Sequence, residues 1–82
     1  MVWDNRVDVH LYNLPTDMRK SHDGLAVLCH QVIGADPLSG KVFVFINKQR
    51  DRVKVLYWDG TGLCLLYKRL DTGKFSNLWD PT

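Results

Sequence analysis

The stretch RDRVKVLYWDGTGLCLLYKRL, residues 50–70, decides the fold of this chain. Two apolar runs, 53–58 and 63–67, flank the turn sequence DGTG (59–62). Aspartate and glycine favour tight turns between strands, so the pattern predicts a β-hairpin. Basic side chains and aromatic rings are mixed along both of its strands. The hairpin is therefore either an ordinary sheet with one hydrated face or a surface that contacts another molecule.

A third apolar run, 42–46, precedes the hairpin, and the polar segment NKQRD (47–51) separates the two. If these five residues form the loop between two antiparallel strands, Phe45 pairs with Val53. Side chains alternate between the two faces of a strand. One face of the sheet is then nearly all apolar, and we predict that it carries the core: Phe43, Phe45, Val53, Val55, Tyr57, Cys64 and Leu66.

The opposite face of the predicted sheet is also largely apolar, although Arg52 and Lys54 belong to it. A sheet face in water is mostly polar, and large exposed apolar patches usually mark contacts with a partner. We expect either a second protein on this face or a cover from the first strand or from Trp3, Phe75, Leu78 and Trp79. The predicted protein-contact residues are Val44, Ile46, Leu56, Trp58, Leu63, Leu65 and Tyr67.

The first half of the chain predicts one strand and one helix. Apolar and polar residues alternate over 7–11, which is typical of a half-buried strand. A helical stripe with spacings of three and four follows: Met18, His22, Leu25, Cys29 and Val32. The helix start stays open among Thr16, Asp17 and Ser21, which can all cap free N–H groups. Gly34 is a natural residue to end the helix.

Together these elements predict an α+β fold. We expect a single domain over residues 1–82, in the order β-α-β-β-β, with one helix on a mostly antiparallel sheet. No apolar run approaches the ~20 residues of a membrane helix, so no membrane contact is expected. The N-terminus lacks the apolar region of a signal peptide, and Cys29 and Cys64 are isolated. These features favour a cytoplasmic protein with reduced thiols.

No group of residues in the sequence points to catalysis, a metal or a cofactor. Ser21, His22 and Asp23 are consecutive, whereas a hydrolytic triad is built from distant segments that converge in space. Cys29 and His30 point to different sides of a helix, and no second pair of metal ligands accompanies them. We therefore predict that the chain is not an enzyme and has no catalytic, metal-binding or cofactor-binding residues.

Basic residues are concentrated in the second half of the chain. Residues 41–82 carry eight against four aspartates, giving +4, whereas residues 1–40 carry three against five, giving −2. Basic side chains can follow a phosphate backbone, and aromatic rings beside them can stack on bases. An ordinary hydrated sheet edge, guarded by lysines, is the alternative. The predicted nucleic-acid-binding residues are Arg50, Arg52, Lys54, Lys68 and Arg69.

The chain resembles a known protein family in three blocks: TDMRKSHDGLAVL (16–28), ADPLSGKVFVF (35–45) and RDRVKVLYWDGTGLCLLYKRLDTGKF (50–75). The family is the TnpB-type accessory protein, the product of the second open reading frame, of bacterial insertion sequences of family sixty-six. The resemblance covers residues 7–76. The matching positions are Asp17, Met18, Arg19, Lys20, Asp23, Gly24, Arg50, Arg52, Lys54, Trp58, Asp59, Gly60, Gly62, Tyr67, Lys68, Arg69 and Gly73.

The resemblance implies a non-catalytic accessory role in transposition, since a separate transposase cuts the strands. It implies three partners between which the sequence does not decide: DNA, the transposase of the same element, and further copies of this chain. The chain departs from the family pattern at Ser21-His22, where glycine and an aromatic residue are usual, and at 47–49, which is less basic than is typical. Typical members continue beyond residue 75 for some tens of residues, so a short variant, a truncated relic and an expressed domain stay open.

Overall fold

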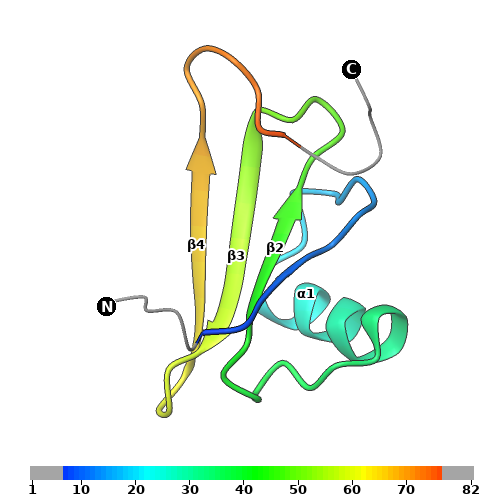
Figure 1. Cartoon of the computed structure of the whole chain (residues 1–82), viewed down its shortest axis with the longest axis vertical. Coiled ribbons are helices and arrows are strands. Elements are labelled where there is room, and N and C mark those ends of the chain that lie inside the picture. The colour runs from blue at the N-terminus through cyan, green and yellow to red at the C-terminus, as the bar shows by residue number, and fades with distance from the viewer. Residues whose placement is uncertain (1–6, 77–82) are drawn as a thin grey trace.

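The computed structural model describes residues 7–76. Its elements, in chain order, are β1 (Val9–Leu11), α1 (His22–Leu28), the π-helical segment η1 (Cys29–Ile33), β2 (Val42–Ile46), β3 (Arg52–Trp58) and β4 (Leu63–Arg69). The strands form one sheet in the order β1-β2-β3-β4, with β1 parallel to β2. The neighbours β2, β3 and β4 are antiparallel (Figure 1). The predicted α+β class and the order of elements are confirmed.

The predicted apolar stripe of the helix holds as far as Cys29 and is lost after it. Ser21 is the residue before α1, and Leu25 and Cys29 are fully buried. From Cys29 on, the chain makes a π-helical turn, whose hydrogen bonds reach one residue further than those of an α-helix. Later positions leave the 3.6-residue period, so Val32 is 59% exposed. Gly34 ends the segment as predicted, with a left-handed φ of 76° that glycine adopts without strain.

The predicted register between β2 and β3 is wrong by one residue. Ile46 pairs with Val53. Asn47 takes the place opposite Arg52, and its N–H donates to the Arg52 carbonyl at 3.2 Å. Because side chains alternate along a strand, this shift moves every side chain of β3 and β4 to the other face relative to β2. The face that α1 covers therefore holds Phe43, Phe45, Arg52, Lys54, Leu56, Trp58, Leu63, Leu65, Tyr67 and Arg69.

Leu56 and Leu66 show the consequence for the core. Leu56, predicted on the outer face, is fully buried and packs with Leu25, Cys29, Phe43 and Phe45. Leu66, predicted in the core, is 56% exposed. The core prediction is thus right for Phe43 and Phe45 and wrong for Leu66, while Val53 is buried as predicted, at 8% exposure, but on the face away from α1.

The same shift divides the predicted protein-contact surface between the two faces of the sheet. Val44 and Ile46 lie on the face away from α1, and Ile46 is only 3% exposed. The helix side holds the other five residues of the set: Leu56, Trp58, Leu63, Leu65 and Tyr67. The seven residues therefore do not form one surface.

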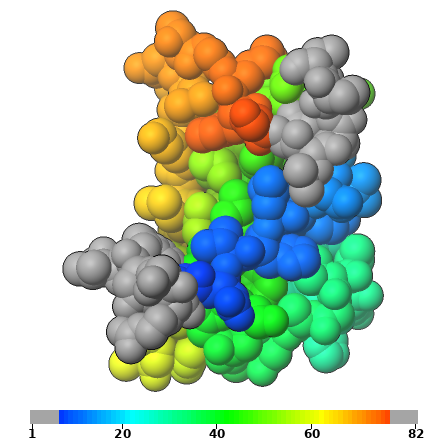
Figure 2. All heavy atoms as spheres, in the orientation of Figure 1, coloured from blue at the N-terminus to red at the C-terminus, as the bar shows by residue number. Residues whose placement is uncertain are grey.

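The segment after β4 returns to the loop between β2 and β3. The Leu70 N–H donates to the Asp51 carbonyl at 2.8 Å, and the Phe75 N–H donates to the Arg50 carbonyl at 2.7 Å. Figure 2 shows this segment, in orange to red, against the end of the sheet. The other residues expected to cover the second apolar face lie outside the described residues: Trp3, Leu78 and Trp79.

The side chain of Asn47 explains the observed register. It is 7% exposed, and its Oδ1 accepts from the backbone N–H groups of Asp51 at 3.1 Å and Arg52 at 3.0 Å. Its Nδ2 donates to Asp51 Oδ1 at 2.7 Å and to Gln49 Oε1 at 3.3 Å. These bonds close the loop with Arg50 at a left-handed φ of 62°. In the sequence Asn47 looks like an ordinary loop residue, so the pattern alone does not reveal the observed register.

Two aspartate substitutions test the corrected faces. Leu56→Asp should unfold the domain, because it buries a carboxylate in an apolar core. Leu66→Asp changes a side chain that is 56% exposed. It should change the free energy of unfolding by less than about 1 kcal/mol. Circular-dichroism melts of both variants and the parent measure these effects, and an equal loss of stability in the two would contradict the register.

Asn47→Ala should lower the free energy of unfolding by about 2 kcal/mol, because two part-buried backbone N–H groups lose their acceptor. Asn13→Ala is the matched control. Asn13 is exposed, and its loss should matter by no more than about 0.5 kcal/mol. Urea unfolding followed by tryptophan fluorescence compares the two variants. Similar losses at both positions would show that the Asn47 amide does not hold the loop.

Candidate nucleic-acid interface

Basic and aromatic side chains occupy the end of the sheet next to the β2–β3 loop. Arg52 pairs with Arg69 across β3 and β4, and Lys54 pairs with Tyr67. Directly paired residues point to the same face of a sheet. These four side chains therefore continue the core face toward the β2–β3 loop, and this end of β3 and β4 lies away from α1 (Figure 1). The predicted placement of Arg52, Lys54 and Tyr67 on one face is confirmed.

Lys54 lies beneath Tyr67 and supports it. Lys54 is 6% exposed, and its Nζ donates to the Lys20 carbonyl at 2.6 Å. The same Nζ lies 4.7 Å from the centre of the Tyr67 ring. A buried ammonium needs such partners, because an unpaired buried charge is strongly unfavourable. Lys54 is thus held in place by the protein itself and is not available as a surface contact.

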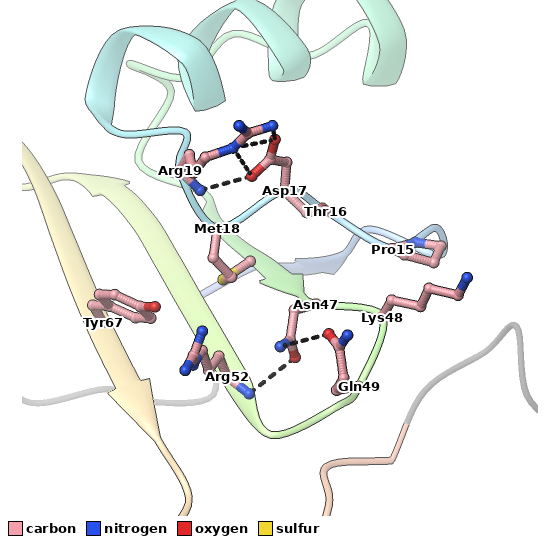
Figure 3. A pocket seen from close by; sticks show the side chains of 10 residues that line it. All are labelled: Pro15, Thr16, Asp17, Met18, Arg19, Asn47, Lys48, Gln49, Arg52 and Tyr67. Carbon is pink, nitrogen blue, oxygen red and sulfur yellow. Dashed lines mark hydrogen bonds and ion pairs between the residues drawn. The ribbon is translucent and has the colours of Figure 1, made fainter.

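Two hollows adjoin at Arg52 and Tyr67. The first, of about 440 Å³, is lined by residues 15–19, residues 47–49, Arg52 and Tyr67 (Figure 3). Figure 3 shows Met18 pointing into this hollow from its loop, between Tyr67 and Asn47. The second hollow, of about 420 Å³, is lined by Arg52, Tyr67, Arg69 and Asp71. The two hollows therefore share Arg52 and Tyr67, and segments from both halves of the chain line the first.

Hydrogen bonds hold the loop 15–19 against the sheet. The Thr16 N–H donates to the Ile46 carbonyl at 2.9 Å. The Asp17 carboxylate accepts from Arg19 Nη2 at 2.6 Å and from the Arg19 backbone N–H at 2.9 Å. The side-chain hydrogen bond, followed by the backbone one, lowers the pKa of Asp17 to about 2. Asp17 is therefore ionised at neutral pH, and Arg19 offsets its charge.

Arg52 and Thr16 line the first hollow, and each has one buried side-chain atom without a partner. Arg52 Nε and Thr16 Oγ1 are both buried and make no hydrogen bond, and Thr16 is 5% exposed. Within residues 7–76 the structure has one ion pair, between Asp17 and Arg19, so Arg52 has no counter-ion there. Buried polar groups usually have partners. Two residues that line one hollow therefore have unused hydrogen-bonding capacity.

The structure brings together two of the five predicted nucleic-acid-binding residues, Arg52 and Arg69. Lys54 lies beneath Tyr67. Lys68 pairs with Val53 and belongs to the opposite face of the sheet. Arg50 lies in the β2–β3 loop, and its carbonyl accepts from the Phe75 N–H. The predicted cluster is thus spread over both faces of the sheet, and its members do not share one position.

Sequence reasoning did not assign Thr16, Arg19 or Lys48 to this site. The sequence places Lys48 with the other cations near the β2–β3 loop without counting it among the predicted binding residues, and it predicts Thr16 only as a possible helix cap. The segment TDMRK belongs to the first block that resembles the family, and this was the available signal. Its position beside Arg52 depends on tertiary contacts between residues more than thirty positions apart, which a local pattern does not show.

The remaining chemically interesting groups lie outside the two hollows. Ser21 Oγ and His22 Nδ1 are 3.2 Å apart on the exposed surface. Burial raises the pKa of the Cys29 thiol to about 11, so it is protonated at neutral pH. In the part of the chain that the structure describes, no three histidine, cysteine or acidic residues are close enough to hold a metal.

The same part contains no helix that is long and apolar enough to cross a membrane.

Comparison with known proteins identifies the family. A family model described as "IS66 Orf2 like protein" matches residues 7–81. The chain belongs to this family. Its members are accessory proteins associated with the transposition of insertion sequences, and the family is not a known catalytic one. The resemblance found in the sequence is confirmed.

Two curated relatives of this IS66 Orf2-like chain come from Sinorhizobium fredii. The uncharacterized protein y4jC is 44% identical over 61 residues, which cover 74% of this chain and 52% of the relative. The uncharacterized protein y4hO is 43% identical over 60 residues, which cover 73% of this chain and 52% of the relative. The chain therefore spans about half the length of the curated relatives it matches. No solved structure matches it.

The carboxyl group of Asp17 should titrate near pH 2 in the folded protein. Its pKa lies below the ordinary value of 3.8, so its bonds to Arg19 stabilise the loop above that pH and are lost as the pH falls toward 2. Carboxyl-carbon NMR shifts measure the midpoint. Arg19→Gln should return the midpoint toward the ordinary value, and an unchanged midpoint in this variant would contradict the assigned cause.

Proposed function

We propose that this IS66 Orf2-like protein is a non-catalytic accessory protein that acts in transposition by binding the phosphate backbone of DNA. The observation that carries the proposal is the guanidinium group of Arg52. It lines both hollows, its Nε is buried without a partner, and no described carboxylate pairs with it. A phosphate group would supply both the hydrogen-bond acceptor and the opposite charge.

The charges around the two hollows also favour an anion. Their linings contain two carboxylates, Asp17 and Asp71, against four cationic side chains: Arg19, Lys48, Arg52 and Arg69. Asp17 is already bonded to Arg19. This leaves three cationic groups facing one carboxylate. A positive excess of this kind attracts a polyanion and brings it to the site faster.

The small number of contacts indicates weak, salt-sensitive binding. Three phosphate contacts would make the logarithm of affinity fall with the logarithm of salt concentration at a slope of about −2.7, from roughly −0.9 for each phosphate. Contacts to phosphate carry no base information. The arginines alone would therefore bind all DNA sequences about equally.

Anisotropy titrations of a fluorescent oligonucleotide at low salt test the proposal. Arg52→Gln should weaken binding about tenfold and reduce the salt slope by about 1, because one charge-assisted phosphate contact is lost. Lys41→Gln removes the same charge from an exposed position outside both hollows. It should change the affinity by less than about twofold. Equal effects of the two substitutions, or no binding at low salt, would overturn the proposal.

Contact with the transposase of the same element, or with another copy of this chain, is the second candidate function. β4 lies at one edge of the described sheet, and Leu66 and Tyr67 on this strand are 56% and 51% exposed. Exposed edge strands can pair with strands of other chains. A dimer in sedimentation velocity that Leu66→Asp dissociates would favour this candidate. A monomer that binds DNA would favour the first.

A further inference from the structure

We infer that the two hollows hold one unpaired nucleotide of a single DNA strand, with its base in the first hollow against Tyr67 and its phosphates on Arg52 and Arg69. This inference rests on the proposed function, because it names the form of DNA that the same site takes. Three observations carry it: the support of the Tyr67 ring, the junction of the two hollows, and the buried hydroxyl group of Thr16.

The Tyr67 ring is a prepared stacking surface. Lys54 Nζ lies beneath the ring, 4.7 Å from its centre, and donates to the Lys20 carbonyl at 2.6 Å. The ring is therefore supported from below by a group that cannot move away without losing its own partner. Tyr67 is nevertheless 51% exposed. An aromatic ring with this exposure beside cationic groups is the usual platform for an unpaired base.

The junction of the hollows places a base site next to a phosphate site. Tyr67 and Arg52 line both hollows, and Arg69 lines the second. Tyr67 and Arg69 are two residues apart on β4, so both side chains project from the same face about 7 Å apart. A base on the ring and a phosphate on the arginines would belong to one nucleotide unit. Figure 3 shows Tyr67 and Arg52 along the same wall of the first hollow.

Thr16 supplies a hydrogen-bonding group for the edge of a base. Thr16 lines the first hollow, and its Oγ1 is buried and has no partner. Asn47 is also buried there, but its amide already makes four hydrogen bonds. Thr16 is thus the buried polar side chain with unused bonding capacity. A buried hydroxyl without a partner lowers stability, and a ligand that bonds to it would remove this cost.

A duplex cannot use this arrangement. Bases inside a duplex are stacked on both faces and paired along their edges, so no ring face is open to Tyr67. A single strand can turn one base into the hollow. The first hollow, about 440 Å³, lies within the range of roughly 300–1,000 Å³ that holds small ligands. The site therefore fits a strand end, a gap or a junction better than continuous double-stranded DNA.

The experiment compares three fluorescent DNAs of equal length in anisotropy titrations of the full chain at low salt: a single strand, its duplex, and an abasic single strand. The abasic strand keeps the phosphates and lacks the bases. The intact single strand should bind about tenfold more tightly than either of the others, because only it can stack on the ring. Equal affinity for the intact and abasic strands would overturn the inference.

Two substitutions of Tyr67 separate stacking from the fold. Tyr67→Phe keeps the ring and should retain the preference for the intact strand. Tyr67→Leu removes the ring and should abolish that preference, while binding of the abasic strand changes by less than about twofold. Thermal melts confirm that both variants fold. A preference that survives Tyr67→Leu would overturn the role of the ring.

Thr16→Val tests the buried hydroxyl by two measurements. The substitution keeps the shape and removes an unpartnered buried polar atom, so the free energy of unfolding should stay equal or rise. The preference for the intact strand should fall about threefold, because one hydrogen bond to the base is lost. An unchanged preference would remove Thr16 from the site.

The outcomes distinguish this inference from the proposed function. If intact, abasic and double-stranded DNA bind alike and Arg52→Gln weakens all three, phosphate binding stands and the nucleotide site is wrong. If no DNA binds at low salt, both are wrong. A preference for the intact single strand that needs both Tyr67 and Arg52 supports the inference.

Discussion

The amide group of Asn47 is the constraint on which the rest of this structure depends. Its bonds to the backbone of Asp51 and Arg52 close the β2–β3 loop and make Ile46 the partner of Val53. Because the side-chain period of a strand is two, this single choice decides which half of the β3 and β4 side chains faces α1. The core, the basic cluster and both hollows are consequences of that choice.

The resulting core face combines two kinds of environment along the same strands. Leu56 packs with Leu25 in the apolar core, while Lys54 and Arg52 precede it on β3, closer to the β2–β3 loop. Lys54 is tolerated because the Lys20 carbonyl and the Tyr67 ring surround its ammonium group. Arg52 has no such partner in the described structure. This difference between two cations on one strand separates a structural residue from a candidate binding residue.

Membership of the IS66 Orf2-like family places the chain among accessory proteins associated with transposition. The loop 15–19, the loop 47–49 and β4 each contribute to the candidate site. The first two are joined by the bond from the Thr16 N–H to the Ile46 carbonyl. The site is therefore built into the folded domain and is not on a separate arm. Its geometry depends on the register between β2 and β3.

The sequence by itself determined the family, the order of elements and the hairpin of β3 and β4. The DGTG turn sets the hairpin register locally, so Arg52, Lys54 and Tyr67 could be placed on one face without a structure. Which face of that hairpin meets the helix was decided only in the tertiary structure. It depends on the amide of Asn47, which fixes the pairing of β2 with β3. A shift of this pairing by one residue decides whether Leu56, as observed, or Leu66, as predicted, lies in the core. The approach of Thr16 to Arg52 is likewise tertiary, because it joins two loops that are distant in sequence and share no local pattern.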